Sequence, residues 1–574
     1  MKVCGSQDGL TVRVIAGTYS ILIGIDLQEA KRVGCLGFSI QRVDLGPQGA
    51  PLPTGQQESR WLPNMLRFPQ DTVDADETPS TSDRSPIQNF RWGDWTGHTG
   101  LTYRYTITAQ YGQWNQLVPG PSVSVEVTTE DPANPDTAVF FNRGAAASNA
   151  YNLKFGNNDP SQLPDGQQQK AYAWLSRGLE EAILAFLSQA KDNSYGLHAA
   201  IYEFQKPNLL QGLKDAMGRG VDVRVVYHYR HMNAKDTTWI DNAAAAHTAG
   251  LDQVCVQRTA DPQGAISHNK FVVLTKDNVP QAVWTGSTNW TDGAIYGQLN
   301  LGHGIYDPAV AQIYENYFQL LHADTDYSPI KDALGKLTLV PVVLPAAPCI
   351  VPILSPQSNK DMLDLYASIC NQADSLMVCA PFELAPEIRT SLEMASGGRL
   401  RFLLVDKTGS LGSAQELNVI SSDTGNEVSV ATTLSSPLHD FQNKLLEGKE
   451  SYHHAGVHIH SKIIASNPLG PDPIIVFGSA NFSHNSTLNN DSNSLIIRGY
   501  TAVADIYVTE FMRMFEHYYF RGKQAQMAAA NQQLGLKEDD SWSAPFYGAD
   551  SPRALARRLF AGTDADGNPI PGYC

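Results

Sequence analysis

ISHNKFVVL at residues 266–274, followed by GSTNW at residues 286–290, is the stretch of sequence that decides how this chain is organised. The pattern returns as VHIHSKII at residues 457–464, followed by GSANF at residues 478–482. In each copy the glycine follows the histidine of the His-x-Lys triplet by 18 positions, and these histidines, His268 and His460, are 192 positions apart. The duplication continues beyond the motif, because AVAQIY at 309–314 recurs as AVADIY at 502–507. A repeat of this length predicts two domains of one fold.

The composition predicts a soluble globular protein of several domains. The 574 residues are 42% hydrophobic and 17% charged, as is usual for folded chains. The formal net charge of −16 argues against sequence-independent binding of nucleic acid, because such binding neutralises phosphates with clustered Lys and Arg side chains. The sequence has no run of 18 apolar residues, and its first residues lack the apolar core of a secretory signal. We therefore expect a location in the cytoplasm, or export without a cleaved signal, and no membrane-spanning segment.

The cysteine pattern favours reduced thiols. The seven cysteines are odd in number and show no CxxC spacing. They are scattered along the chain at Cys4, Cys35, Cys255, Cys349, Cys370, Cys379 and Cys574.

Residues 1–135 carry strand signals and little helix. Residues 103–108 and 123–127 alternate between apolar and polar side chains, and Gly/Pro turns separate such runs. This pattern predicts an all-β accessory domain, a small sandwich of the fibronectin-like kind.

Beyond residue 135 the pattern changes to helices that alternate with apolar strands. Each copy of the motif follows the same order of helix, strand, helix and strand, which predicts an α/β fold with a largely parallel sheet covered by helices. The expected boundaries are 150–340 for the first repeat and 357–522 for the second, with a proline-rich linker at 340–356. A C-terminal tail at 523–574 is expected on the surface of the paired repeats.

The motif itself suits chemistry on a phosphoryl group. His and Lys are separated by one residue in an apolar strand, so both side chains are expected on one face of the sheet. A lysine ammonium binds non-bridging phosphoryl oxygens, while an imidazole attacks phosphorus or transfers a proton. The Ser and Asn of Gly-Ser-x-Asn add neutral hydrogen-bond donors near a tight turn.

These residues resemble the phospholipase D superfamily, whose signature is HxK with an Asp five residues after the Lys (the HKD motif), followed by GSxN. The resemblance covers about residues 150–520 and implies two repeats packed about a pseudo-twofold axis around one metal-independent site. It also implies that His268 attacks phosphorus to form a phosphohistidine and that His460 serves as general acid and base. The residues it implies for holding the phosphoryl oxygens are Lys270, Lys462, Asn289 and Asn481, with Ser287 and Ser479 in support.

The sequence departs from the family pattern at two places in each repeat. Thr275 and Asn467 stand where the family has the Asp of HKD. The Glu that often follows GSxN and orients the catalytic histidine is also missing, and the corresponding stretches read QLN at 298–300 and DSN at 491–493. Asn300 and Asn493 are the expected substitutes, because an amide carbonyl can still fix an imidazole tautomer.

A zinc site is the alternative interpretation of the histidines near the second motif. His453, His454, His458 and His460 are spaced closely enough to converge on a metal, but no cluster of Cys, Asp or Glu ligands accompanies them. We therefore expect no metal and no cofactor, with His458 lining the substrate cleft. Trp290 and Phe482 are expected to pack beneath the site.

The sequence thus predicts a phosphodiesterase, and three substrate classes stay open. A phospholipid headgroup is the first choice, because the chain is acidic and holds both repeats. Peripheral membrane contact and a monomeric state are then expected. Nuclease action on the same fold is the alternative, and a degenerate binding protein without activity is the third.

Overall fold

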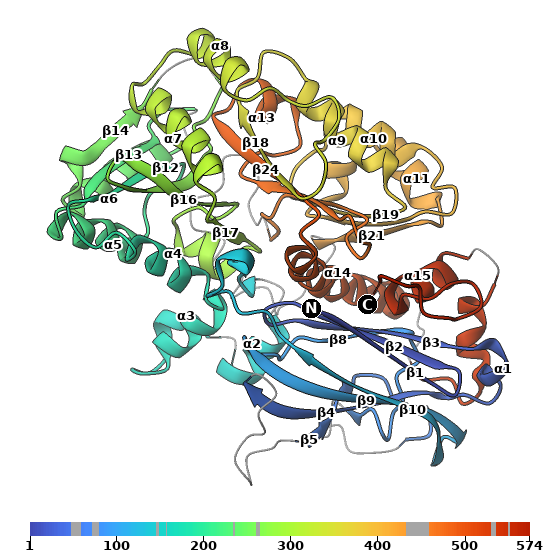
Figure 1. Cartoon of the computed structure of the whole chain (residues 1–574). Coiled ribbons are helices and arrows are strands. Elements are labelled where there is room, and N and C mark those ends of the chain that lie inside the picture. Colours follow the sequence, from blue (N-terminus) through green and yellow to red (C-terminus); the bar gives the residue numbers. More distant parts are fainter. Residues whose placement is uncertain are drawn as a thin grey trace.

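The computed structural model describes ten segments of the chain: residues 1–47, 59–71, 80–144, 148–156, 158–232, 236–259, 264–431, 458–529, 535–548 and 551–573. Figure 1 shows two α/β halves side by side, with a layer of β-strands beneath them.

The N-terminal strands form two antiparallel four-stranded sheets. The first has the order β1 (Lys2–Gln7), β2 (Leu10–Ala16), β3 (Ile21–Leu27), β8 (Arg91–Asp94), and the second has the order β10 (Gln116–Thr128), β9 (Leu101–Gln113), β4 (Gly37–Pro47), β5 (Ser59–Trp61). One apolar core is shared by side chains of both sheets, among them Val12, Ile23, Ile40 and Ile107. This N-terminal region also contains the short strands β6 (Pro63–Asn64) and β7 (Ser80–Thr81) and the four-residue helix α1 (Glu29–Arg32).

Each motif copy lies in a seven-stranded sheet, and the two sheets have the same order of strands. The first is β11 (Val139–Phe141), β17 (Leu301–Ile305), β16 (Val279–Gly286), β15 (Lys270–Lys276), β12 (Tyr195–Ile201), β13 (Asp222–His228), β14 (Cys255–Arg258). The second is β18 (Cys349–Ser355), β24 (Ser492–Arg498), β23 (Ile474–Gly478), β22 (Ile463–Ser466), β19 (Ser375–Ala380), β20 (Leu400–Val405), β21 (Asn426–Val430). The α/β class and the duplication expected from the sequence are therefore both present.

The expectation of a largely parallel sheet is wrong. Only β12, β13 and β14, and likewise β19, β20 and β21, run parallel, while the other pairings in each sheet are antiparallel. One reason is that the strand of each His-x-Lys motif, β15 or β22, is joined to the next strand without a helix. Asp277 and Asn278, both with positive φ, turn β15 directly into β16, which is the geometry of a tight hairpin.

The predicted boundaries also missed the edge strand of each sheet. β11 lies in front of the predicted first repeat, and β18 lies within the predicted linker. Pro352 sits inside β18 and pairs with Leu495. Proline in a strand is confined to sheet edges, so a segment that looked like a linker in sequence is an edge strand in the fold.

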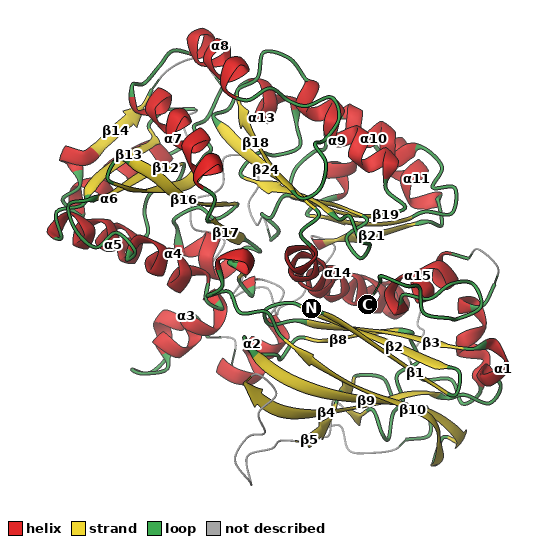
Figure 2. Cartoon of the chain, viewed as in Figure 1, coloured by secondary structure: helices red, strands yellow, loops and turns green. Residues whose placement is uncertain are grey.

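Helices cover both faces of the two sheets (Figure 2). α3 (Gln168–Ser176), α4 (Leu179–Leu187), α5 (Pro207–Gly218) and α6 (Thr238–Thr248) share a core with the outer face of the first sheet. α9 (Asp361–Gln372), α10 (Pro386–Glu393) and α11 (Ala414–Ser422) do so on the second sheet. The inner faces share one core with α7 (Pro308–His322), α8 (Tyr327–Leu337) and α14 (Thr501–Ala529). Arg177 and Gly178, both with positive φ, separate α3 from α4.

A buried ion network on α14 ties three parts of the chain together. Glu510 accepts hydrogen bonds from Arg177 (2.7 Å), Arg513 (2.8 Å) and Ser20 (2.6 Å). Burial alone would raise the pKa of this carboxyl, but Arg177 and Arg513 lower it to about 2. Glu510 is therefore charged at neutral pH and links Ser20, just before β3 of the N-terminal sheets, with the α3–α4 junction and α14, which in Figure 1 lies between the lower strands and the upper halves.

The C-terminal segment contacts the N-terminal strands as well as the paired repeats on which it was expected. Phe560 of α15 (Pro552–Ala561) contacts Phe402 of the second repeat, as expected. However, Arg557 forms a buried ion pair with Asp26 of β3, and Trp542 donates a hydrogen bond of 2.8 Å to the carbonyl of Cys35. Two further helices are α2 (Ser148–Phe155) and α13 (His484–Leu488). Among the described residues, none of the helices is long and apolar enough to cross a membrane.

The expectation that every cysteine stays reduced is wrong for Cys4, which forms a disulfide. Cys35, Cys255, Cys349, Cys370 and Cys379 carry free thiols, as expected. Sequence spacing failed here because folding brings cysteines together irrespective of their separation along the chain.

Candidate active site

The histidine of each His-x-Lys motif lies on a short lead-in segment just before a central strand. We define the lead-in segments as residues 265–268 before β15 and 458–460 before β22. The Gly-Ser-x-Asn turns follow at the ends of β16 and β23, where a Cβ on Gly286 would lie 2.3 Å from the carbonyl oxygen of Leu301. A Cβ on Gly478 would lie 2.3 Å from the carbonyl oxygen of Asn493. Only glycine permits this approach of two backbones, which explains why the motif needs it twice.

Each lead-in segment pairs with backbone of the other repeat. Ser267 of the first repeat forms a parallel bridge with Asp491 of the second, and Ile459 of the second forms one with Leu299 of the first. His268 N donates to the carbonyl of Asp491 (2.7 Å), and His460 N donates to the carbonyl of Leu299 (2.9 Å). Each histidine is thus held by the partner repeat, so neither half of the site is complete alone.

The exchange brings His268 and His460 together. Their ring centroids lie 6.2 Å apart, and each residue is 4% exposed. Burial, together with the charges of Lys270 and Lys462, holds the pKa of both imidazoles well below the ordinary value. Both rings are therefore neutral in the free site, and one lone-pair nitrogen on each is available for attack or proton transfer.

The lysines lie beside the histidines as the alternation predicts. In the first repeat, the ring of Tyr202 contacts His268 (centroids 5.1 Å) and lies 5.0 Å from the Lys270 ammonium, so both side chains are on one side of the sheet. Lys462 is completely buried. Two ammonium groups next to two neutral imidazoles make the site a binding place for an anion.

The two asparagines proposed to replace the family glutamate do different things. Asn300 Oδ1 lies 3.0 Å from His460 Nδ1, which is also 2.9 Å from the carbonyl of Ser287. Two acceptors at Nδ1 place the proton there and leave the lone pair on Nε2. Asn493 Oδ1 instead accepts from Thr285 (2.8 Å) and Tyr314 (3.0 Å).

The serines and asparagines of the Gly-Ser-x-Asn turns also divide into two groups. Ser287 donates to Asn300 (2.8 Å), and Ser479 accepts from the amide N of Asn493 (3.0 Å), so both hydroxyls brace the turns. Asn289 Nδ2 donates to Glu203 (2.8 Å), a buried carboxylate. Asn481 is half-buried, and its backbone N donates to Ser486 (3.0 Å).

Two different groups occupy one equivalent position behind the lead-in segments. Strand register makes His228, at the end of β13, the counterpart of Asp406, which follows β20. His228 Nδ1 accepts from the backbone N of Ser267 (3.3 Å), and Asp406 Oδ1 accepts from that of Ile459 (3.1 Å). Burial lowers the pKa of His228 to about 3 and raises that of Asp406 to about 6. At neutral pH the first repeat therefore has a neutral imidazole where the second has a carboxylate.

Part of the chain is similar to known proteins. Residues 183–322 match the family model described as cardiolipin synthase, PLD-like domain. The matched residues lie within the first repeat, so that repeat is similar to a phospholipase D-like domain. A search of curated proteins finds no match.

Several solved structures are similar to this chain at low identity. Phosphatidylserine synthase of Haemophilus influenzae is 12% identical, with 62% of this chain and 92% of that chain covered and a TM-score of 0.40. The yeast tyrosyl-DNA phosphodiesterase is 13% identical, with 54% and 84% covered and a TM-score of 0.31. The phospholipase D family member Nuc of Salmonella typhimurium is 17% identical, with 29% and 95% covered and a TM-score of 0.22.

The two positions that replace the HKD aspartate lie at the far ends of their strands from the histidines. Thr275 is buried at a bulge in β15. Asn467 has φ 46°, and its side chain accepts from the backbone N of Asp374 (2.9 Å) and Ser375 (3.0 Å). Asn467 thus ties β22 to the start of β19, which is an architectural role.

Of the four histidines of the alternative zinc site, His458 and His460 lie among the described residues. His458 lies at the site, 8% exposed, with Nδ1 3.9 Å from Asp406, whereas His453 and His454 fall outside the described residues. Within the described part of the chain, no group of three His, Cys, Asp or Glu side chains is placed to hold a metal ion. Trp290 and Phe482 are buried in the helix-covered cores, as expected.

Sequence reasoning missed four residues at or just after the carboxyl ends of parallel strands: Tyr202, Glu203, His228 and Asp406. The sequence does contain a signal for these residues, because the carboxyl ends of neighbouring parallel strands lie at the same edge of a sheet. Apolar strands that end in HYR at 228–230 and DK at 406–407 mark that edge.

Proposed function

We propose that this protein is a phosphodiesterase of the phospholipase D type that hydrolyses, or transfers, the headgroup of a phospholipid. One observation carries the proposal: the rings of His268 and His460, 192 positions apart in sequence, lie 6.2 Å apart in a buried site. A phosphorus atom placed between two imidazoles is accessible to attack from one side and to proton transfer from the other.

In the first step, Nε2 of neutral His268 attacks phosphorus and forms an N–P bond while the P–O bond to the leaving alcohol breaks. His460 gives its proton to the departing oxygen. In the second step, water attacks the phosphohistidine, His460 takes a proton from that water, and the N–P bond breaks to restore His268. An alcohol in place of water gives transfer instead of hydrolysis.

The charges of the site support this sequence of events. Burial, with the charges of Lys270 and Lys462 added to it, holds the pKa of both imidazoles low. A bound phosphodiester brings a negative charge that offsets the ammonium groups and raises the pKa of His460. Substrate binding itself therefore allows His460 to carry the proton that the leaving group needs.

The division of labour between the histidines rests on their second contacts. His460 has two acceptors at Nδ1, including Asn300 Oδ1, and these stabilise the imidazolium that a general acid must form. The side-chain oxygen of Asn493, the counterpart of Asn300, accepts from Thr285 and Tyr314 instead. This difference favours His268 as nucleophile and His460 as acid and base, with Lys270, Lys462, Asn289 and Asn481 around the phosphoryl oxygens.

The domain organisation belongs to the same proposal. The two repeats, with β11 and β18 added to the segments 150–340 and 357–522, are related by a pseudo-twofold axis that runs between the histidines. The reciprocal bridges of Ser267 with Asp491 and of Ile459 with Leu299 support this symmetry. Residues 1–135 form the accessory β-sandwich, to which the segment 523–574 is attached through Trp542 and Arg557.

The substrate is tested by assaying the purified protein on phosphatidylcholine vesicles and, separately, on plasmid and single-stranded DNA. His268→Ala serves as the blank in every assay. Headgroup release that is lost in the variant is the expected result. DNA cleavage that is lost in the variant would replace the phospholipid by nucleic acid, and inactivity on both would contradict the proposal.

A further inference from the structure

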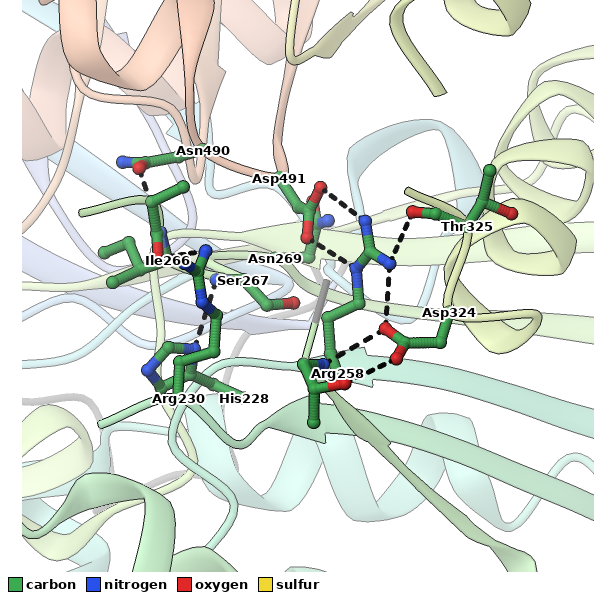
Figure 3. Close-up of polar contacts among 12 residues, drawn as sticks. His228, Arg230, Arg258, Ile266, Ser267, Asn269, Asp324, Thr325, Asn490 and Asp491 are labelled. Atoms are coloured by element: carbon green, nitrogen blue, oxygen red, sulfur yellow. Dashed lines mark hydrogen bonds and ion pairs between the residues drawn. The ribbon is translucent and has the colours of Figure 1, made fainter. Parts of the chain in front are cut away.

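The lead-in segment of His268 is held by an ion pair that the other half of the site lacks. Asp491 brackets the segment through its backbone: its N donates to the carbonyl of Ile266 (3.1 Å), and its carbonyl accepts from His268 N (2.7 Å). The neighbouring Asn490 accepts from Ile266 N (3.1 Å). Figure 3 shows these second-repeat residues lying across the first-repeat segment.

Arg258 fixes the side chain of Asp491. Its Nε lies 2.9 Å and its Nη2 3.4 Å from the two carboxylate oxygens of Asp491. Nη1 binds Asp324 (2.9 Å) and the carbonyl of Thr325 (2.8 Å), just after α7 of the first repeat. The guanidinium therefore anchors second-repeat Asp491 to the first repeat at the end of β14 (Figure 3). The side chains of Arg258 and Asp491 are only 3% and 11% exposed.

The corresponding position in the other half is apolar. Leu299 brackets the lead-in segment of His460 with the same backbone pair: its N donates to the carbonyl of His458 (2.8 Å), and its carbonyl accepts from His460 N (2.9 Å). Its side chain is completely buried in the shared core. The fold thus accepts either a leucine or a paired aspartate at this place, and only the His268 half uses the ion pair.

We propose that Arg258 is a positioning residue for His268, acting through Asp491 across the boundary between the repeats. This inference rests on the proposed function for its kinetic consequence, but its structural consequence is independent of activity. If Arg258 is removed, Asp491 becomes a buried carboxylate without its counter-ion, and relief of that state displaces the backbone that holds His268. His460 is held by Leu299 and Asp406 and should stay in place.

The burial of Asp491 gives the proposal a pH signature. Burial raises the pKa of this carboxyl even with Arg258 beside it, so loss of Arg258 raises it further. A group whose pKa is raised in the folded state lowers stability as pH rises through that pKa. Other titratable groups around Asp491 are Arg230, which favours the charged form, and Asp324, which opposes it. Tyr317 and Tyr327 also lie close enough for the Asp491 charge to raise the pKa of their hydroxyls.

The test compares Arg258→Met with the double variant Arg258→Met/Asp491→Leu, which copies the leucine of the other half. Arg498→Met is the matched control, because Arg498 pairs with Asp472 (2.6 Å) at a more exposed place in the second repeat. The activity readout is kcat and KM on a soluble p-nitrophenyl phosphodiester. The second readout is the rate at which diethyl pyrocarbonate modifies His268 and His460, followed separately by peptide mass spectrometry.

Arg258→Met is expected to lower kcat by about tenfold to a hundredfold, with a smaller change in KM, because misplacing a reacting group acts mainly on the chemical step. It should also speed modification of His268 but not of His460, and lose more activity at high pH than at low pH. The double variant should restore protection of His268 and most of kcat, and the control should behave as the wild type.

The proposal is overturned if Arg258→Met leaves both kcat and the protection of His268 unchanged. It is also overturned if both histidines become equally reactive, because that reports general loosening, or if the double variant is no better than the single one. An inactive wild type would instead contradict the proposed function, and the modification rates would still decide the role of Arg258.

Discussion

Replacing Asp406 by Asn is expected to make the protein more stable at neutral pH. Burial raises the pKa of this carboxyl from 3.8 to about 6, against the backbone N–H groups of His458 and Ile459 and the charge of Lys407, which lower it. Its second oxygen, Oδ2, is buried without a hydrogen-bond partner among the described residues. The charged form therefore costs free energy in the folded state, and Asn, which keeps an acceptor for the two N–H groups, avoids that cost.

The difference of about 2 pKa units corresponds to about 3 kcal/mol. Because the pKa in the folded state lies above that in the unfolded state, the cost is absent below pH 3.8, grows between 3.8 and about 6, and is complete above that range. Asp406→Asn should thus exceed the wild type in free energy of unfolding by up to about 3 kcal/mol at pH 7.5, and by little at pH 4.

Urea unfolding at pH 4, 5, 6 and 7.5 measures this difference directly. Asp472→Asn is the control, because its exposed ion pair with Arg498 contributes less than about 1 kcal/mol. A variant that is less stable than the wild type at pH 7.5, or a gain that does not change with pH, would refute the reasoning. A gain that follows the expected pH range would mean that the chain retains a costly carboxylate behind His460.

Three further results are expected. Glu510→Gln should lower the free energy of unfolding at pH 7 by at least about 3 kcal/mol, because Arg177 and Arg513 hold the pKa of Glu510 down to about 2. This loss should shrink as pH falls from 4.5 towards 2. Equal loss at pH 3 and pH 7 in urea unfolding would contradict this. Asn300→Ala should lower kcat about tenfold by removing one acceptor from His460 Nδ1. Asn493→Ala should mainly lower the melting temperature. The reverse pattern in kinetics and thermal melts would be evidence against the assigned roles. Excess chelator should leave kcat unchanged in a steady-state assay, and a loss restored by zinc would overturn the metal-independent mechanism.

Much of the fold followed from the sequence because period and repetition are local signals. The spacing of His268 and His460 from their glycines located both motifs, and the predicted alternation of helices and strands before each motif is present in both repeats. Strand direction was not available in the same way, since it depends on whether a turn or a helix joins two strands. The edge strand β18 was missed because its proline resembles a linker until the neighbouring strand is known.

The site followed from the sequence only as far as the motif reaches. The contact of Asn300 with His460 agrees with the expected substitution, but the bonds of Asn493 to Thr285 and Tyr314 depend on packing between the repeats. The pairing of Arg258 with Asp491 spans 233 positions and has no counterpart in the second half that would mark it in sequence.

The covalent intermediate provides the most direct test of the two-histidine account. His460→Ala should be incubated with a phosphatidyl p-nitrophenyl ester, whose leaving group needs no general acid, and examined by intact-protein and peptide mass spectrometry. The account predicts that one phosphatidyl group accumulates on His268, because the base for the water step is missing, and that His268→Ala gains none. Label on another residue, or equal labelling of His268→Ala, would contradict the assignment of His268 as the nucleophile.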